Sequence, residues 1–179
     1  PADPTNNNDA TFTVTSSDTA GSGLASTTCT LDAVAVTCGD AASGLSDGSH
    51  DYVATATDDA GNSASATHTW VVDTTDPAVA ISDTPADPTN SDAADMTVTS
   101  SDGGSGLAST TCTIDNGATT CGDALASLAD GSHTYVATAT DNAGNSASAT
   151  FTWVVDTTAP SATIDSNPAD NNNDNDAAT

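Results

Sequence analysis

Apolar and polar residues alternate along much of the chain with a period of two. Residues 50–57 place Tyr52, Ala54 and Ala56 on one face, and residues 64–72 alternate in the same way after a turn-rich DDAGN segment. This period is typical of half-buried β-strands, and the same segments show no helical spacing of apolar positions. The two segments therefore predict a β-hairpin, which ends in a VVDTTDP linker because proline cannot donate to a strand ladder.

The hairpin occurs twice, because residues 47–77 and 130–160 differ at only four of 31 positions. Further alternating segments predict strands at residues 10–18, 25–32, 34–39 and 78–83. A complete unit then has about seven short strands, as in a small antiparallel β-sandwich. We predict an all-β chain of tandem sandwich domains. Residues 1–75 form a domain that lacks its first strand, residues 76–158 form a complete domain, and residues 159–179 supply the first strand and loop of a following domain.

The composition narrows the range of partners. The chain has no Lys or Arg, 25 acidic residues that are all Asp, and a formal net charge of -25. This charge repels nucleic acid and anionic membranes, so we expect neither as a partner. No apolar run is long enough to insert into a membrane, and no signal-peptide pattern opens the sequence. We expect a mature secreted protein or a segment of one.

Each unit carries two cysteines at a spacing of nine, which does not fit a CxxC zinc or redox motif. In the second unit the pair is symmetric about Asn116 and Gly117, which favour a two-residue type I′ turn. This register puts Cys112 opposite Cys121 at a non-hydrogen-bonded position, where Cα atoms approach to about 4.5 Å. We predict the disulfides Cys29–Cys38 and Cys112–Cys121, each contributing about 2 to 3 kcal/mol.

The first unit lacks the leading strand that the second unit has, and a spare leading strand follows the second unit. A sandwich without this strand exposes an edge and an apolar groove. Two arrangements remove the exposure: a preceding module in a longer covalent array, or head-to-tail joining of separate chains by β-strand addition. In the second arrangement the donor strand is Ser161, Ala162, Thr163, Ile164 and Asp165.

Several motifs are shared with a known family of repeats: the DGSH turn, the ATDDAGN loop, the TW pair, the DTTDP linker and the paired cysteines of CTLDAVAVTC. They resemble the bacterial immunoglobulin-like repeats that occur in tandem in giant surface adhesins, and the resemblance covers nearly the whole chain. It implies immunoglobulin-like sandwiches in an extracellular stalk or fibre. The sequence departs from those repeats in lacking Lys, Arg, Glu and Gln.

The resemblance also implies Ca²⁺ near the junctions between units. Asp and Asn oxygens are hard ligands of the kind that Ca²⁺ prefers. The alternative is that these side chains accept hydrogen bonds from turn N–H groups or are solvated. The candidate ligands are Asp73, Asp76 and Asp156 in the linkers, Asp58, Asp59 and Asn62 in the first hairpin loop, and Asp141, Asn142 and Asn145 in the second.

The remaining distinctive side chains have structural interpretations. His50 and His133 start strands, where bonding to the backbone is expected, and Trp70 and Trp153 occupy core positions, with a ligand platform as the alternative. Ser and Thr residues lack the surroundings of a catalytic triad, so we do not expect an enzyme. The sequence predicts a structural module of an extracellular filament or adhesin stalk. The alternative is a secreted module that binds a glycan or another surface through its loops.

Overall fold

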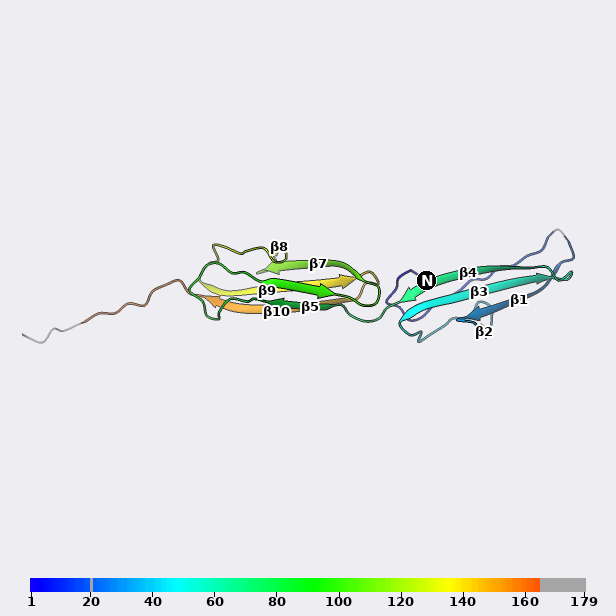
Figure 1. Ribbon diagram of the computed structural model, residues 1–179, viewed down its shortest axis with the longest axis horizontal. Helices are drawn as coiled ribbons and strands as arrows, with labels where there is room; N and C mark the ends of the chain where they lie inside the picture. The colour runs from blue at the N-terminus through cyan, green and yellow to red at the C-terminus, as the bar shows by residue number, and fades with distance from the viewer. Residues whose placement is uncertain (20, 165–179) are drawn as a thin grey trace, which may run out of the picture.

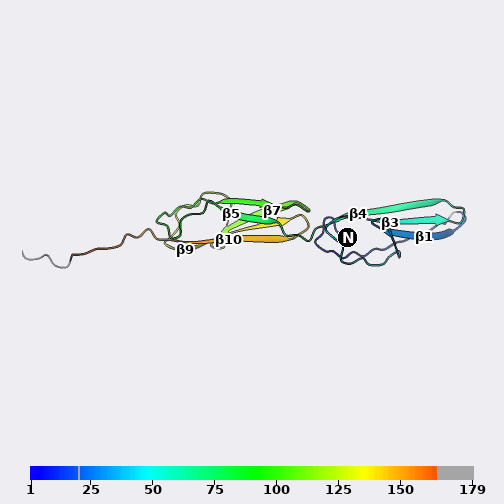
Figure 2. The same ribbon diagram turned by 60° about the horizontal axis from the view of Figure 1, so that its bottom comes forward.

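The described chain folds into two β-units that lie end to end. The computed structural model describes residues 1–19 and 21–164, in which every regular element is a strand. Figures 1 and 2 show the two units in line along the long axis, with residues 156–164, the tail, leaving the far end of the second unit. Among these residues no helix is long and apolar enough to cross a membrane.

Each unit is built on a four-stranded antiparallel sheet. In the first unit the sheet order is β2-β1-β3-β4, and in the second it is β10-β9-β7-β8. The first unit contains β1 (Leu24–Leu31), β2 (Val34–Val36), β3 (Gly48–Asp58) and β4 (Ser63–Val72). The second contains β7 (Leu107–Ile114), β8 (Gly117–Thr119), β9 (Gly131–Asp141) and β10 (Ser146–Val155), together with a second sheet of β5 (Ala78–Ser82) and β6 (Thr97–Ser101).

The sandwich of antiparallel sheets predicted from the alternating pattern is confirmed. Among the described residues the second unit has six strands and the first has four, against the expected number of about seven. Outside the named strands of the second unit, single bridges join Thr89 to Val155 and Ala94 to Leu125.

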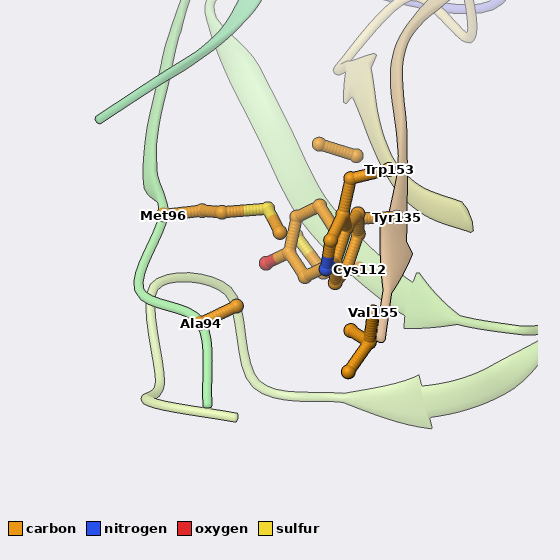
Figure 3. Packing of buried hydrophobic residues seen from close by; sticks show 7 residues of the cluster. Ala94, Met96, Cys112, Tyr135, Trp153 and Val155 are labelled. Atoms are coloured by element: carbon orange, nitrogen blue, oxygen red, sulfur yellow. The ribbon is translucent and has the colours of Figure 1, made fainter. Parts of the chain in front are cut away.

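The core of the second unit lies between its two sheets. Trp153, Tyr135 and Val155 are each 1% exposed, and Figure 3 shows Met96 reaching toward Tyr135 and Trp153 from the opposite side. On β9, alternate side chains point inward, as a period of two requires. Val79 and Ile81 of β5 pack against this cluster from the second layer.

The first unit has no counterpart of β5 among the described residues, and this changes its structure. The predicted strand over residues 10–18 is wrong: Ala10 makes one bridge, with Ala42, and the remaining residues belong to no strand. Their counterpart in the second unit, β6, pairs with β5. Within residues 1–19 and 21–164, residues 13–17 have no such partner to complete a ladder, which is why the same sequence pattern gives a strand in only one unit.

Both predicted pairs of cysteines are bridged, with Cα atoms 5.2 Å apart in each disulfide. The predicted register is wrong by two residues, however, because Cys112 pairs with Thr119 and the turn residues are Asp115 and Asn116. Both turn residues are left-handed, with φ of 49° and 66°. The Asp115 carboxylate accepts a hydrogen bond from the Thr134 backbone N–H at 2.8 Å, which anchors the turn in this position.

A buried histidine holds each of these turns. His133 lies with Nδ1 2.7 Å from the Asp115 carboxylate and Nε2 2.8 Å from the Ala129 carbonyl oxygen. Both neighbours are acceptors, so only the doubly protonated ring donates to both. The hydrogen bond to Ala129, with that to Asp115, raises the pKa of His133 above 6.5. His50 repeats the arrangement with Ser46 and Asp32, and its pKa is raised in the same way.

These ion pairs make stability depend on pH. A group whose pKa is raised by folding stabilises the fold fully below its unfolded pKa, and this contribution is lost as pH rises through the folded pKa. We expect the thermal unfolding midpoint to fall as the pH rises above about 6.5, the pKa of histidine in the unfolded chain, and to fall less in the His50→Asn/His133→Asn variant. Differential scanning calorimetry measures both. His68→Asn, at an exposed position, is the control and should retain the wild-type slope. Equal slopes in all three proteins would contradict the assignment.

Candidate functional site

The junction between the units is built around the linker of residues 73–77, which connects β4 to β5. Asp73 is 1% exposed. The Ser105 backbone N–H donates to its carboxylate at 2.6 Å, and the Asn145 side-chain amide donates to its backbone carbonyl at 2.7 Å. Two loops of the second unit therefore hold the first residue of the linker.

The close approach of Asp73 depends on a glycine. A Cβ atom added at Gly104 would lie 2.5 Å from the carboxylate atoms of Asp73, which is shorter than any van der Waals contact. The neighbouring Gly103 has open space around the same position. Of the two adjacent glycines, only Gly104 must lack a side chain for the Asp73 carboxylate to approach the DGGSG loop.

Three carboxylates converge at this junction. Asp73, Asp102 and Asp141 each offer one oxygen, and these oxygens lie within 4.8 Å of one another. Hydrogen bonding by Ser105 lowers the pKa of Asp73, so this carboxyl is ionised at neutral pH. The chain has no Lys or Arg that could neutralise the group. Oxygen ligands at this spacing, beside the Asn145 amide, fit the preferences of Ca²⁺.

The structure brings some of the predicted calcium ligands together and separates others. Asp73 and Asp141 meet, and Asn145 donates to both of them. Asp102 was missed, because packing against the linker, rather than a local sequence pattern, brings it to Asp73. The other candidates lie outside the group. Asp76 is exposed in the linker, Asp156 is exposed beyond β10, and the Asn142 side chain donates to the Ser105 carbonyl oxygen. The Asn62 side chain donates to the Asp58 carboxylate, and both lie beside Asp59 at the outer end of the first unit.

The joint has two halves: the linker, and an acidic socket formed by Asp102, Asp141 and Asn145 of the loops that receive it. Both halves recur at the outer ends of the molecule. The tail repeats the linker, but Asp156 and Pro160 are exposed whereas Asp73 and Pro77 are buried. At the opposite end, the first unit carries Asp18, Asp58 and Asn62 at the places of Asp102, Asp141 and Asn145. Each unit thus has a linker at one end and an acidic socket at the other.

An open groove runs along the first unit where β5 lies in the second. It has a volume of about 450 Å³ and is lined by residues that include Phe12, Val14, Tyr52, Ala54 and His68. A hollow of about 210 Å³ continues it toward the acidic socket, beside Asp18 and Asp58. The predicted donor residues Ser161, Ala162, Thr163 and Ile164 lie exposed in the tail, whereas Asp165 lies outside the described residues.

One protein family matches the second unit of the chain. Residues 75–157 match the family described as the bacterial Ig-like domain. The second unit has an immunoglobulin-like fold. A solved structure of the fibronectin(III)-like modules of Clostridium thermocellum CbhA is similar at 13% sequence identity, covering 86% of this chain and 87% of that chain with a TM-score of 0.41. No curated protein matches the sequence.

The tryptophan of each unit belongs to the core. Trp153 of the immunoglobulin-like domain and Trp70 of the first unit are each 1% exposed, so neither offers a ligand platform. The large exposed apolar side chains of the described residues are Leu24, Val34, Val154 and Ile164, none of them aromatic.

The contact at Gly104 gives a direct test of the junction. We expect Gly104→Ala to expel Asp73 and to cost about 1 to 3 kcal/mol, because the added methyl group overlaps the carboxylate. Residual dipolar couplings then require separate alignment tensors for the first unit and the immunoglobulin-like domain. Gly103→Ala is the matched control and should retain a single tensor. A single tensor in Gly104→Ala would show that the contact does not hold the units together.

Proposed function

We propose that this protein is a structural module of an extracellular filament or giant adhesin stalk, in which immunoglobulin-like units join head to tail. The junction carries this proposal: Asp73 is buried between the units, and both halves of the same joint recur at the outer ends. The two disulfides favour an oxidising compartment outside the cytoplasm. The fold is of a kind that is typically non-enzymatic.

The course of the chain suits a load-bearing role. In the second unit the chain enters through β5 and leaves through β10, at opposite ends of the unit (Figure 1). Tension along the molecule is then parallel to the strands, and it acts on many ladder hydrogen bonds at once because these bonds lie perpendicular to the strands. The ladder between β9 and β10 joins ten residue pairs and is the longest ladder among the described residues of the second unit.

Calcium at the junction is part of this proposal. Asp73, Asp102 and Asp141 are the residues that would hold the ion, and they come from the linker and from two loops of the second unit. A divalent cation would offset their mutual repulsion and so stiffen the joint.

Calcium binding is measurable as a change in stability. At a free Ca²⁺ concentration about 100 times the dissociation constant, binding stabilises the folded state by about 2.7 kcal/mol, so we expect the unfolding midpoint to rise by several degrees. EGTA should reverse the rise. Asp102→Asn should weaken the response, and Asp76→Asn, an exposed acid of the same linker, should not. An unfolding midpoint that changes with neither Ca²⁺ nor EGTA would contradict calcium binding at the junction.

The mechanical role itself predicts a rigid molecule. Small-angle X-ray scattering of the calcium-loaded chain at low concentration should fit a single straight arrangement of the two units, as in Figure 1. The profile of Gly104→Ala should require a mixture of bent arrangements, and that of Gly103→Ala should match the wild type. If the wild-type profile already requires a hinged ensemble, the chain does not act as a stiff spacer.

A further inference from the structure

We propose that the open groove of the first unit binds the tail of a second copy of this chain, with residues 161–164 added as a strand antiparallel to residues 14–17. This inference deepens the head-to-tail function proposed above and rests on it. It identifies the partner as a second copy and specifies the register of the contact.

The first observation is that the groove exposes a face that is covered in the second unit. Ala137 and Ala139 of β9 are each 0% exposed, whereas their counterparts Ala54 and Ala56 of β3 are only partly buried. On the neighbouring strand β4, the inward-facing Ala64, Ala66 and His68 are exposed. An apolar strand laid along this face would remove these side chains from water, which is the main driving force for strand addition here.

The second observation is that the tail carries the strand that fits. Residues 161–164 repeat the place of residues 78–81 at the constant shift of 83, and Ile164 takes the place of Ile81. Ile81 packs against the core cluster of its own unit. Ile164 is 92% exposed, although it occupies a core-facing position of the pattern. A large aliphatic side chain gains most by burial, so Ile164 is the main anchor of the proposed contact.

The register follows from β5 and β6. In the second unit Ala78 pairs with Ser101, and Ile81 pairs with Val98. The counterparts of Ser101 and Val98 are Ser17 and Val14, because one residue fewer separates β6 from the cysteine in the second unit. The proposed pairs are therefore Ser161 with Ser17, Ala162 with Ser16, Thr163 with Thr15, and Ile164 with Val14.

The acceptor segment already has the position that this register needs. The Ser16 hydroxyl lies 2.5 Å from the Thr27 hydroxyl, and its counterpart in β6, Ser100, lies 2.7 Å from Thr110. Side chains along residues 12–15 alternate between half-buried and exposed, as they do in β6. The described residues contain no partner strand for this segment.

The tail of the same copy cannot reach the groove. The tail leaves the end of the molecule opposite to the acidic socket of the first unit, and it points away from that unit (Figure 1). It cannot return along two units to place Asp156 beside Asp18 and Asp58. Joining the tail of one copy to the groove of the next is a heterologous contact, which extends into a filament without closing.

Cysteine cross-linking tests the register. In Ser17→Cys/Ser161→Cys, both substitutions lie on the exposed face, where the counterpart residues Ala78 and Ser101 are also exposed. Oxidation in Ca²⁺ buffer should give a ladder of covalent multimers on a non-reducing denaturing gel. Mass spectrometry after Asp-N digestion should find peptides joined between positions 17 and 161. Thr15→Cys/Ser161→Cys, two residues out of register on the same face, should give at least about tenfold less of the joined peptide. Equal yields from the two variants, or no joined peptide, would overturn the proposal.

A second pair of variants separates assembly from folding. Because Ile164 is exposed in the single chain, Ile164→Asp should leave the unfolding midpoint of the dilute protein unchanged and abolish multimers in light scattering. Ile164→Val should retain them. Multimers that persist in Ile164→Asp would contradict the proposal.

A synthetic peptide of residues 156–164 gives an independent readout. It should protect the amides of residues 14–17 from hydrogen exchange and should shorten the cross-linked ladder, and absence of both effects would contradict the inference. The outcomes also separate this inference from the proposed function. If the molecule is rigid in scattering but no cross-link forms, strand addition is rejected and the role as a stiff spacer stands. If the cross-link forms but the molecule is hinged, the role as a stiff spacer is rejected and strand addition stands.

Discussion

A β-sheet face made of alanine gains stability when a second layer covers it, and this contribution distinguishes the two units of the chain. In the second unit, Val79 and Ile81 of β5 pack against the cluster that contains Ala137, and both Ala137 and Ala139 are fully buried. In the first unit the same face is open, Ala54 and Ala56 are partly exposed, and residues 13–17 do not form the strand that β6 forms. One strand thus decides whether the repeated sequence gives a closed sandwich or a groove.

Charge shapes the rest of the molecule. The only side chains that can carry a positive charge are three histidines, and two of them are committed to Asp32 and Asp115 inside the hairpins. The carboxylates at the junction therefore depend on backbone N–H groups, on Asn145 and, in our proposal, on Ca²⁺. In our proposal, a chain without Lys or Arg builds in this way a joint that responds to divalent cations.

The sequence predicts those features that depend on local pattern and repetition. Alternation along residues 50–57 and 64–72 was enough for the long hairpins, and the cysteine spacing was enough to name both disulfides. The turn of the short hairpin was misplaced, because its position depends on the bond between Asp115 and His133, 18 residues away. The strand at residues 10–18 was wrong because its partner is absent from the described residues. Asp102 was missed because only packing between the units brings it to Asp73.

The most direct measurement of the central claim, that the first unit is completed by a strand from another copy, is a density map of the assembled protein. Our account predicts an extended segment antiparallel to residues 14–17, with an isoleucine side chain beside Val14 and an aspartate beside Asp18 and Asp58. An empty groove in the assembly, or a segment of different sequence or direction lying in it, would contradict the account.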